Sequence, residues 1–276
     1  ELAAAQQHLE EALAKKRDLG QKMGEAATMV ALGSLAIDRG NLATAGNSLE
    51  AATALARETA SRAVLSNALA AQVEMALESD DFTRARIWAE ESIALRRELG
   101  RRGKVDEGRL LLARIGLESG EIRAVLPDLE ALAAEESPGR APDLAAAIEL
   151  ARARALAGLG RIGEARAALA RGAALSFASE GLEIQLLAAA AALATEIAGA
   201  KPLEGLALEP SQAITVAAAK GFAIQALELD LLRLRDRSRD GGGGEVAAGL
   251  RRIAAAASES GALRVARLAE TAAASL

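Results

Sequence analysis

Apolar residues recur at steps of three and four along this chain, in segments separated by turns. Around the turn at Gly40, these positions are Val30, Leu32, Leu35 and Ile37 before it and Leu42, Ala45, Leu49, Ala52 and Leu55 after it. Steps of three and four place side chains on one face of an α-helix. The pattern therefore predicts two amphipathic helices that pack as an antiparallel pair on either side of Gly40.

This pair of segments repeats with a period of about 40 residues. New apolar segments begin at Gly20, Gly100, Gly181, Gly221 and Gly261. Thr59 and Arg140 stand at the two remaining positions of the same ~40-residue series. The turns inside the pairs fall half a period away, at Gly40, Asp80, Gly120 and Gly160. Glycine suits the left-handed position that ends a helix, and Asn41 or Asp80 is expected to cap the helix that follows. The period predicts an all-α fold, a right-handed α-α superhelix of helix pairs.

The same period divides the chain into repeats of one continuous domain, residues 1–276. We expect repeats at 20–59, 60–99, 100–139, 140–180, 181–220 and 221–260, preceded by the second helix of a truncated repeat at 1–19 and followed by a capping helix at 261–276. The chain starts at Glu1, so we expect it to be a piece of a longer protein. Leu2, Leu9 and Leu13 would then lack their upstream partner helix, which predicts weak self-association through the N-terminal helix.

Three segments depart from the regular pattern. Pro127 falls inside the second helix of the third repeat, which should kink or begin late. Two prolines between residues 201 and 210 should shorten the second helix of the fifth repeat to about Ser211–Lys220. The run Gly241–Gly244 is expected to form a flexible loop between the helices of the sixth repeat.

The residues Leu32-Gly33, Ala36, Gly40, Ala45, Leu49 and Ala52 stand at the relative spacings of a known signature. In this respect the chain resembles the tetratricopeptide repeat (TPR) family. The period of about 40 residues is longer than the usual period of that family. In this it is similar to the longer repeats of bacterial signalling proteins of the maltose-regulon activator type. HEAT-type repeats share the period and remain the structural alternative.

The amino-acid composition limits which core residues, ligands and cellular locations are to be expected. Apolar residues make up 51% of the chain and aromatic residues 1%, so the core must consist of Leu, Ile, Val and Ala. The net charge is −5, with 33 basic and 38 acidic residues interspersed, which argues against nucleic acid as a ligand. The lack of cysteine excludes disulfides and thiolate chemistry and favours a cytoplasmic location. The apolar run 186–193 is too short to cross a bilayer, so we expect a buried helix and no membrane insertion.

No catalytic constellation is apparent in the sequence. His8 is the sole histidine, the glycine run lacks the lysine and hydroxyl residue of a phosphate-binding loop, and the neighbouring acids Glu90 and Glu91 point to different sides of a helix. We therefore expect no catalytic, cofactor-binding or metal site, and a protein that is not an enzyme.

The resemblance implies a ligand-binding groove. In the TPR family the first helices line the inside of the superhelix, and the corresponding positions here are Asn67, Glu74, Glu107, Leu110, Arg114, Leu150, Arg154, Glu228 and Arg235. Arg114 and Arg154 occupy equivalent positions in adjacent repeats. They could bind an acidic partner side chain, or each could pair with Glu74 or Glu107 inside the groove.

The expected function follows from this resemblance. It implies a protein-interaction or scaffold module that binds a peptide or protein partner in its concave groove, within a larger bacterial signalling or regulatory protein. The alternative is a ligand-sensing regulatory domain of a transcriptional activator or a kinase.

Overall fold

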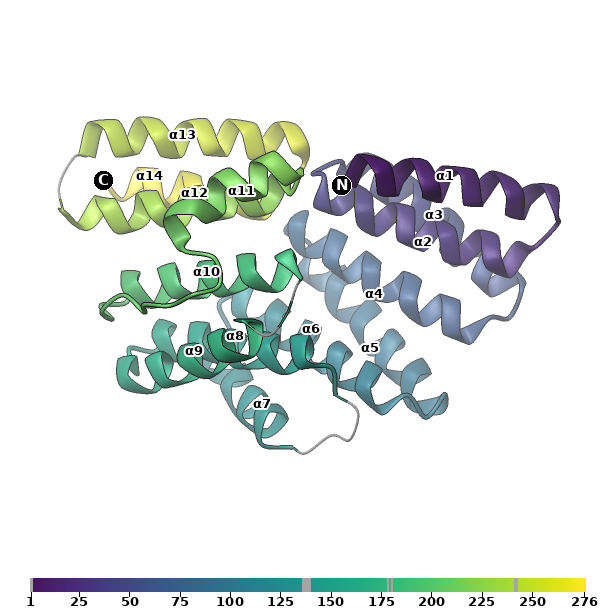
Figure 1. Cartoon of the computed structure of the whole chain (residues 1–276), viewed down its shortest axis with the longest axis horizontal. Coiled ribbons are helices and arrows are strands. Elements are labelled where there is room, and N and C mark those ends of the chain that lie inside the picture. Colours follow the sequence, from purple (N-terminus) through teal and green to yellow (C-terminus); the bar gives the residue numbers. More distant parts are fainter. Residues whose placement is uncertain (1, 136–139, 178, 180, 241–242) are drawn as a thin grey trace.

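The computed structural model describes residues 2–135, 140–177, 179, 181–240 and 243–276, which form successive helices joined by turns (Figure 1). The helices are α1 (Leu2–Asp18), α2 (Lys22–Asp38), α3 (Leu42–Glu58), α4 (Arg62–Glu78), α5 (Phe82–Glu98), α6 (Arg102–Glu118), α7 (Ile122–Ala134), α8 (Pro142–Gly158), α9 (Ile162–Phe177), α10 (Leu182–Ile197), α11 (Pro210–Lys220), α12 (Ala223–Arg237), the 3-10 turn η1 (Ser238–Asp240), α13 (Gly243–Ser260) and α14 (Leu263–Ala274). Successive helices pack on one another, and the described residues contain no strand. The prediction of an all-α helical-repeat superhelix is confirmed.

A left-handed residue follows most helices, about 20 positions apart in the first repeats. Positive φ angles occur in these turns at Gly20, Gly40, Ala60, Asp80, Gly100, Gly120, Gly160, Gly199, Gly221 and Gly261. At Gly40 the turn is closed by the bonds from its own N–H to Ile37 O (2.8 Å) and from Asn41 N–H to Ala36 O (2.8 Å). These are the two bonds of a Schellman motif. Gly181 differs, because it is the extended N-cap of α10 (φ −72°).

The helix caps agree with the sequence at one turn and differ at another. Asn41 Oδ1 accepts the backbone N–H of Thr44 at 3.2 Å, as expected. The prediction for Asp80 is wrong, since Asp81 is the cap and accepts the N–H of Arg84 at 2.9 Å. Asp80 itself takes the left-handed position with φ 59°. Its carboxylate is therefore left to interact with a distant helix.

The glycine of the Leu32-Gly33 pair has a packing role. A Cβ added to Gly33 would lie 2.6 Å from Leu49 Cγ, which is closer than carbon atoms can approach. Leu49 is fully buried, so it has no free space to move into. The absent side chain thus allows α2 to pack directly against α3.

The two irregular repeats depart from the pattern in different ways. For α7, which contains Pro127, the sequence predicts a kink or a late start; the late start is wrong, because the helix begins at Ile122, and it ends at Ala134. α11 begins with Pro210 in its first turn, where a missing N–H costs nothing. The expected shortening of this helix to about Ser211–Lys220 is confirmed. Gly241 and Gly242 lie outside the described residues, while Gly243 and Gly244 belong to α13.

The first and last repeats pack against each other, so the superhelix closes on itself. One core cluster combines residues of α2 to α4 with residues of α12 to α14. A methyl group added to Gly40 would lie 3.2 Å from Ala223 Cβ, and one added to Gly261 would lie 3.6 Å from Leu42 Cβ. Figure 1 shows the purple N-terminal helix with its start beside the green and yellow C-terminal helices.

This closure changes the expectation for the N-terminal leucines. Leu2 packs against the core cluster of α10 to α12, and a methyl group on Gly221 would lie 3.4 Å from its Cδ1. The expectation that Leu2 lacks a covering partner is therefore wrong. Leu9 and Leu13 remain half-buried on α1, which carries no fully buried residue.

The apolar run of residues 186–193 lies inside α10, where Leu186 and Leu193 are buried. It is a core helix, as expected. Among the residues that the structure describes, we find no helix that combines the length and the apolarity needed to cross a bilayer.

Candidate functional site

Charged side chains from the first helices of several pairs meet on the inner side of the superhelix. The tripeptide Leu-Glu-Ser occurs at residues 77–79 and again at 117–119, at the ends of α4 and α6. It places Glu78 and Glu118 in the last residue of their helices, next to the negative end of the helix dipole. Such a position disfavours a carboxylate unless a cation is nearby.

Arg264 of α14 supplies that cation. Its guanidinium nitrogens lie 3.0 Å from Glu78 Oε2, 3.1 Å from Glu118 Oε2 and 3.3 Å from Glu228 Oε2. Arg264 is 4% exposed and Glu78 is 8% exposed. One buried arginine thus joins α14 to α4, α6 and α12.

Two further arginines extend the arrangement. Arg154 of α8 donates a hydrogen bond to Glu118 at 2.8 Å and lies 4.0 Å from Glu228. Arg114 of α6 donates to Glu74 of α4 at 2.6 Å. We call these residues the inner ion-pair network: Glu74, Glu78, Glu118, Glu228, Arg114, Arg154 and Arg264.

The network shifts the pKa values of its carboxyl groups. For Glu118, burial favours the neutral form, but the charges of Arg264 and Arg154 outweigh it and lower the pKa to about 2. The pKa of Glu228 is lowered for the same reasons. For Glu78, burial is the larger effect, and its pKa is raised despite the neighbouring Arg264. Of Glu78, Glu118 and Glu228, Glu78 is therefore the one that holds a proton most readily.

A second group of acids lies where the first and last repeats meet. Burial, followed by the charges of Glu183 and Glu74, raises the pKa of Asp38 to about 7, and a hydrogen bond with Gln225 offsets this only in part. Burial and the charge of Glu74 also raise the pKa of Glu183. This seam, with Asp38 at the end of α2 and Glu183 at the start of α10, therefore carries a carboxyl group that titrates near neutral pH.

The structure gives three of the sequence-predicted groove positions other surroundings. Leu110 and Leu150 lie in the largest core cluster, 7% and 0% exposed, so they are core residues and do not line a groove. Glu107 pairs with Lys104 on its own helix at 2.7 Å. Two further positions, Asn67 of α4 and Arg235 of α12, are exposed, which agrees with a place on an accessible surface.

The other four predicted positions come together in the network. Arg114 pairs with Glu74, which is one of the alternatives that the sequence left open. Arg154 pairs with Glu118 instead of an acid at the equivalent groove position, and Glu228 pairs with Arg264.

The residues missed from the sequence are Glu78, Glu118 and Arg264. The repeated Leu-Glu-Ser was a usable signal for the two glutamates. For Arg264 there was no local signal, because its partner Glu78 is 186 residues away.

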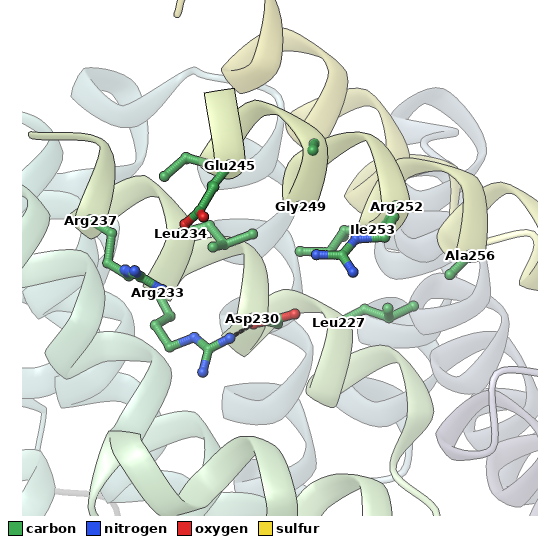
Figure 2. Close-up of a pocket in the computed structure, with 12 residues that line it drawn as sticks. Leu227, Asp230, Arg233, Leu234, Arg237, Glu245, Gly249, Arg252, Ile253 and Ala256 are labelled. Carbon is green, nitrogen blue, oxygen red and sulfur yellow. Dashed lines mark hydrogen bonds and ion pairs between the residues drawn. The ribbon is translucent and has the colours of Figure 1, made fainter. Parts of the chain in front are cut away.

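An open cleft lies elsewhere, on the last helix pair. It has a volume of about 880 Å³ and runs between α12 and α13 (Figure 2). Apolar residues form its floor and arginines stand at its edges. The sequence pattern singled out Arg235 of α12 but gave no sign of a cleft beside that helix.

No group of three or more His, Cys, Asp or Glu side chains in the described ranges has the arrangement of a metal site. What the network can do chemically is to bind opposite charges, because its guanidinium and carboxylate groups are arranged as pairs. His8 is exposed on α1.

Comparison with models of known protein families gives no match for this chain, and no curated protein matches it either. The helical-repeat architecture is thus established by the structure, while the resemblance to tetratricopeptide repeats rests on the spacing of residues in the sequence.

Proposed function

We propose that this chain is a non-enzymatic interaction module that binds a segment of a partner protein on the inner side of its superhelix. The observation that carries the proposal is the inner ion-pair network. A buried ion pair is often no more stabilising than apolar residues of the same size. A network of seven charged residues is therefore poorly explained by stability alone.

The local placement of these charges supports the same proposal. Glu78 and Glu118 stand at helix C-termini, and Arg264 stands in the first turn of α14. Each charge has the same sign as the helix end that carries it, so each is disfavoured within its own helix. Conflicts between local and global preference are expected at functional sites. Binding of a charged partner segment would exchange these internal pairs for intermolecular ones.

The alternative function, a ligand-sensing regulatory domain of a transcriptional activator or a kinase, is favoured by one specific feature. Arg264 links the last helix to α4 and α6, so a ligand that competes for these carboxylates would alter the contact between the two ends of the chain. A contact that a ligand can switch in this way is what a regulatory domain needs.

The proposal is tested with a photo-crosslinking amino acid at two exposed positions. Asn67 lies seven residues before Glu74 on the same face of α4, and Ala54 on α3 serves as the outer control. Crosslinks to a protein from the source organism are expected from position 67. They should disappear in the double variant Glu74→Arg, Arg114→Glu. This variant keeps the internal ion pair but reverses the charge that a partner contacts at each of the two positions. Crosslinks from position 54 alone, or unchanged crosslinks in the swapped protein, would contradict the proposal.

A further inference from the structure

The cleft between α12 and α13 lies outside the inner ion-pair network and has a surface character of its own. Its floor contains Leu234, Val246 and Ile253, which are 8%, 4% and 4% exposed. All three belong to the core cluster that joins the two ends of the chain. The floor is therefore fixed by core packing and does not depend on mobile side chains.

The cleft exists because α12 and α13 pack closely over only part of their length. They touch where Gly249 faces Leu234, since a Cβ on Gly249 would lie 2.8 Å from Leu234 Cδ1. Taken as a whole, the two helices pack less extensively than α2 and α3 or α8 and α9 do. The space left between them is open to solvent, so it suits a segment of another protein better than an enclosed small molecule.

The charges at the edges of the cleft are mostly basic. Figure 2 shows Arg237 of α12 on one side and Arg252 of α13 on the other, with the apolar floor between them. Arg233 is paired with Asp230 at 2.5 Å. Among the described residues, neither Arg237 nor Arg252 has a carboxylate within 4.0 Å, and both are exposed. Within the described part of the chain, two guanidinium groups thus flank an apolar floor without a carboxylate paired to either of them.

We propose that this cleft is a docking site for an acidic amphipathic helix of a partner protein. Leucine-like side chains of such a helix would pack on the floor, and its carboxylates would pair with Arg237 and Arg252. Arginine binds carboxylates through two parallel hydrogen bonds, which gives this contact orientation as well as strength. The acids Asp230 and Glu245 also line the cleft, and Asp230 is paired with Arg233. The carboxylates of the partner helix must therefore lie at the edges, beside Arg237 and Arg252.

The test uses a fluorescent peptide of about 18 residues, a common helix length, with leucines on one face and glutamates beside them. Its binding to the full chain is measured by fluorescence anisotropy. Arg237→Glu combined with Arg252→Glu is expected to weaken binding at least tenfold, or about 1.4 kcal/mol. Binding should also weaken as the salt concentration rises, because the contact depends on exposed charges.

The chain offers a matched control on the same two helices. Arg235→Glu combined with Arg251→Glu makes the same change of charge at exposed positions outside the cleft, and it is expected to leave binding unchanged. Circular dichroism and thermal melting of both double variants check that each is folded. Equal weakening in both variants, no binding of the acidic peptide, or equal binding of a peptide with lysines in place of the glutamates would overturn the proposal. Preferential binding of anionic lipid vesicles would overturn it in favour of a membrane surface.

Discussion

Single residues set the geometry of the turns, and Ala60 does so at a cost. Its φ is 50°, in the left-handed region that Gly20 and Gly100 occupy at the equivalent turns of the neighbouring repeats. A side chain in this conformation is disfavoured by about 1–2 kcal/mol. We expect Ala60→Gly to raise the free energy of unfolding by about 0.5–1 kcal/mol after the greater flexibility of unfolded glycine is subtracted. Urea denaturation measures this change.

The matched control is the reverse substitution in the next repeat. Gly100 has φ 67°, and a methyl group added to it would meet no atom within 4 Å, so Gly100→Ala tests conformation without a steric clash. It should lower stability by about 1 kcal/mol. A loss of stability in Ala60→Gly would show that the left-handed conformation is not what limits this turn.

Asp38 gives the molecule a dependence on pH. Its pKa is raised from 3.8 to about 7, so the folded state holds this proton more tightly than the unfolded state does. The resulting stabilisation is present at pH 4 and is lost as the pH rises to about 7, at about 1.4 kcal/mol for each pH unit. Asp38→Asn cannot ionise, so its stability relative to the natural protein should increase from pH 5 to pH 8. Thermal melts across this range measure the difference.

Asp18→Asn is the control for this prediction, since Asp18 is exposed on α1 and its substitution makes the same chemical change. It is expected to alter the melting temperature by the same small amount at each pH. If Asp38→Asn behaved in that way too, the seam would not contain a carboxyl group held in its neutral form.

At the scale of elements, α14 is held by two arginines in different environments. Arg264 is buried among Glu78, Glu118 and Glu228, whereas the half-exposed Arg267 pairs with Asp80 at 2.6 Å. Arg264→Met removes the side chain that joins these three carboxylates, and we expect a loss of about 3–5 kcal/mol. Arg267→Met should cost about 1 kcal/mol or less, because an exposed pair contributes little. Chemical denaturation of both variants compares them directly.

A second substitution, at Glu78, distinguishes two causes of the stability loss in Arg264→Met: an unpaired carboxylate and the lost packing of the arginine side chain. With Arg264 replaced, the carboxyl group of Glu78 keeps only the weaker influence of Arg114, and its raised pKa rises further. Adding Glu78→Gln to Arg264→Met should therefore recover part of the lost stability at neutral pH. If it recovers none, the loss comes from packing of the long side chain and not from the charge.

The elements themselves were largely readable from the sequence, because their signals are local. Apolar periodicity indicated the helix pairs, and the two prolines before residue 211 predicted the shortened α11. The cap at Asp80 was assigned one residue too early, since two adjacent aspartates carry equal signals and only the left-handed turn distinguishes them. Pro127 lies inside α7 without delaying the start of the helix at Ile122.

At the scale of the whole molecule, local signals no longer suffice. How far the superhelix turns depends on the sum of small rotations between repeats, and no residue pattern reports that sum. Arg264 and Glu78 are 186 residues apart in the sequence, so their contact depends on this sum and has no local signal. The sequence leaves two alternatives open for Arg114, and the structure shows the internal pair with Glu74. Arg154 pairs with Glu118, an acid that the sequence pattern does not indicate.

Closure also changes how the molecule should unfold. In an open array each repeat contacts only its neighbours, so a defect in the last repeats leaves the first ones unaffected. Here Ile224 of α12 belongs to the same core cluster as Ala36 and Leu42, and it lies 3.7 Å from a methyl group placed on Gly40. A defect at this position should therefore reach α2 and α3.

The last prediction uses two buried isoleucines. Ile224→Ala at the seam and Ile148→Ala in α8, which are 3% and 1% exposed, should each cost about 2–5 kcal/mol. Hydrogen exchange is expected to quicken in both α12 and α2–α3 when Ile224 is shortened. When Ile148 is shortened, it should quicken in α6–α9 while α2–α3 keep their protection. A faster exchange confined to α11–α14 in Ile224→Ala would mean that the ends behave as those of an open solenoid, and the closed contact would then contribute nothing to the stability of the first repeats.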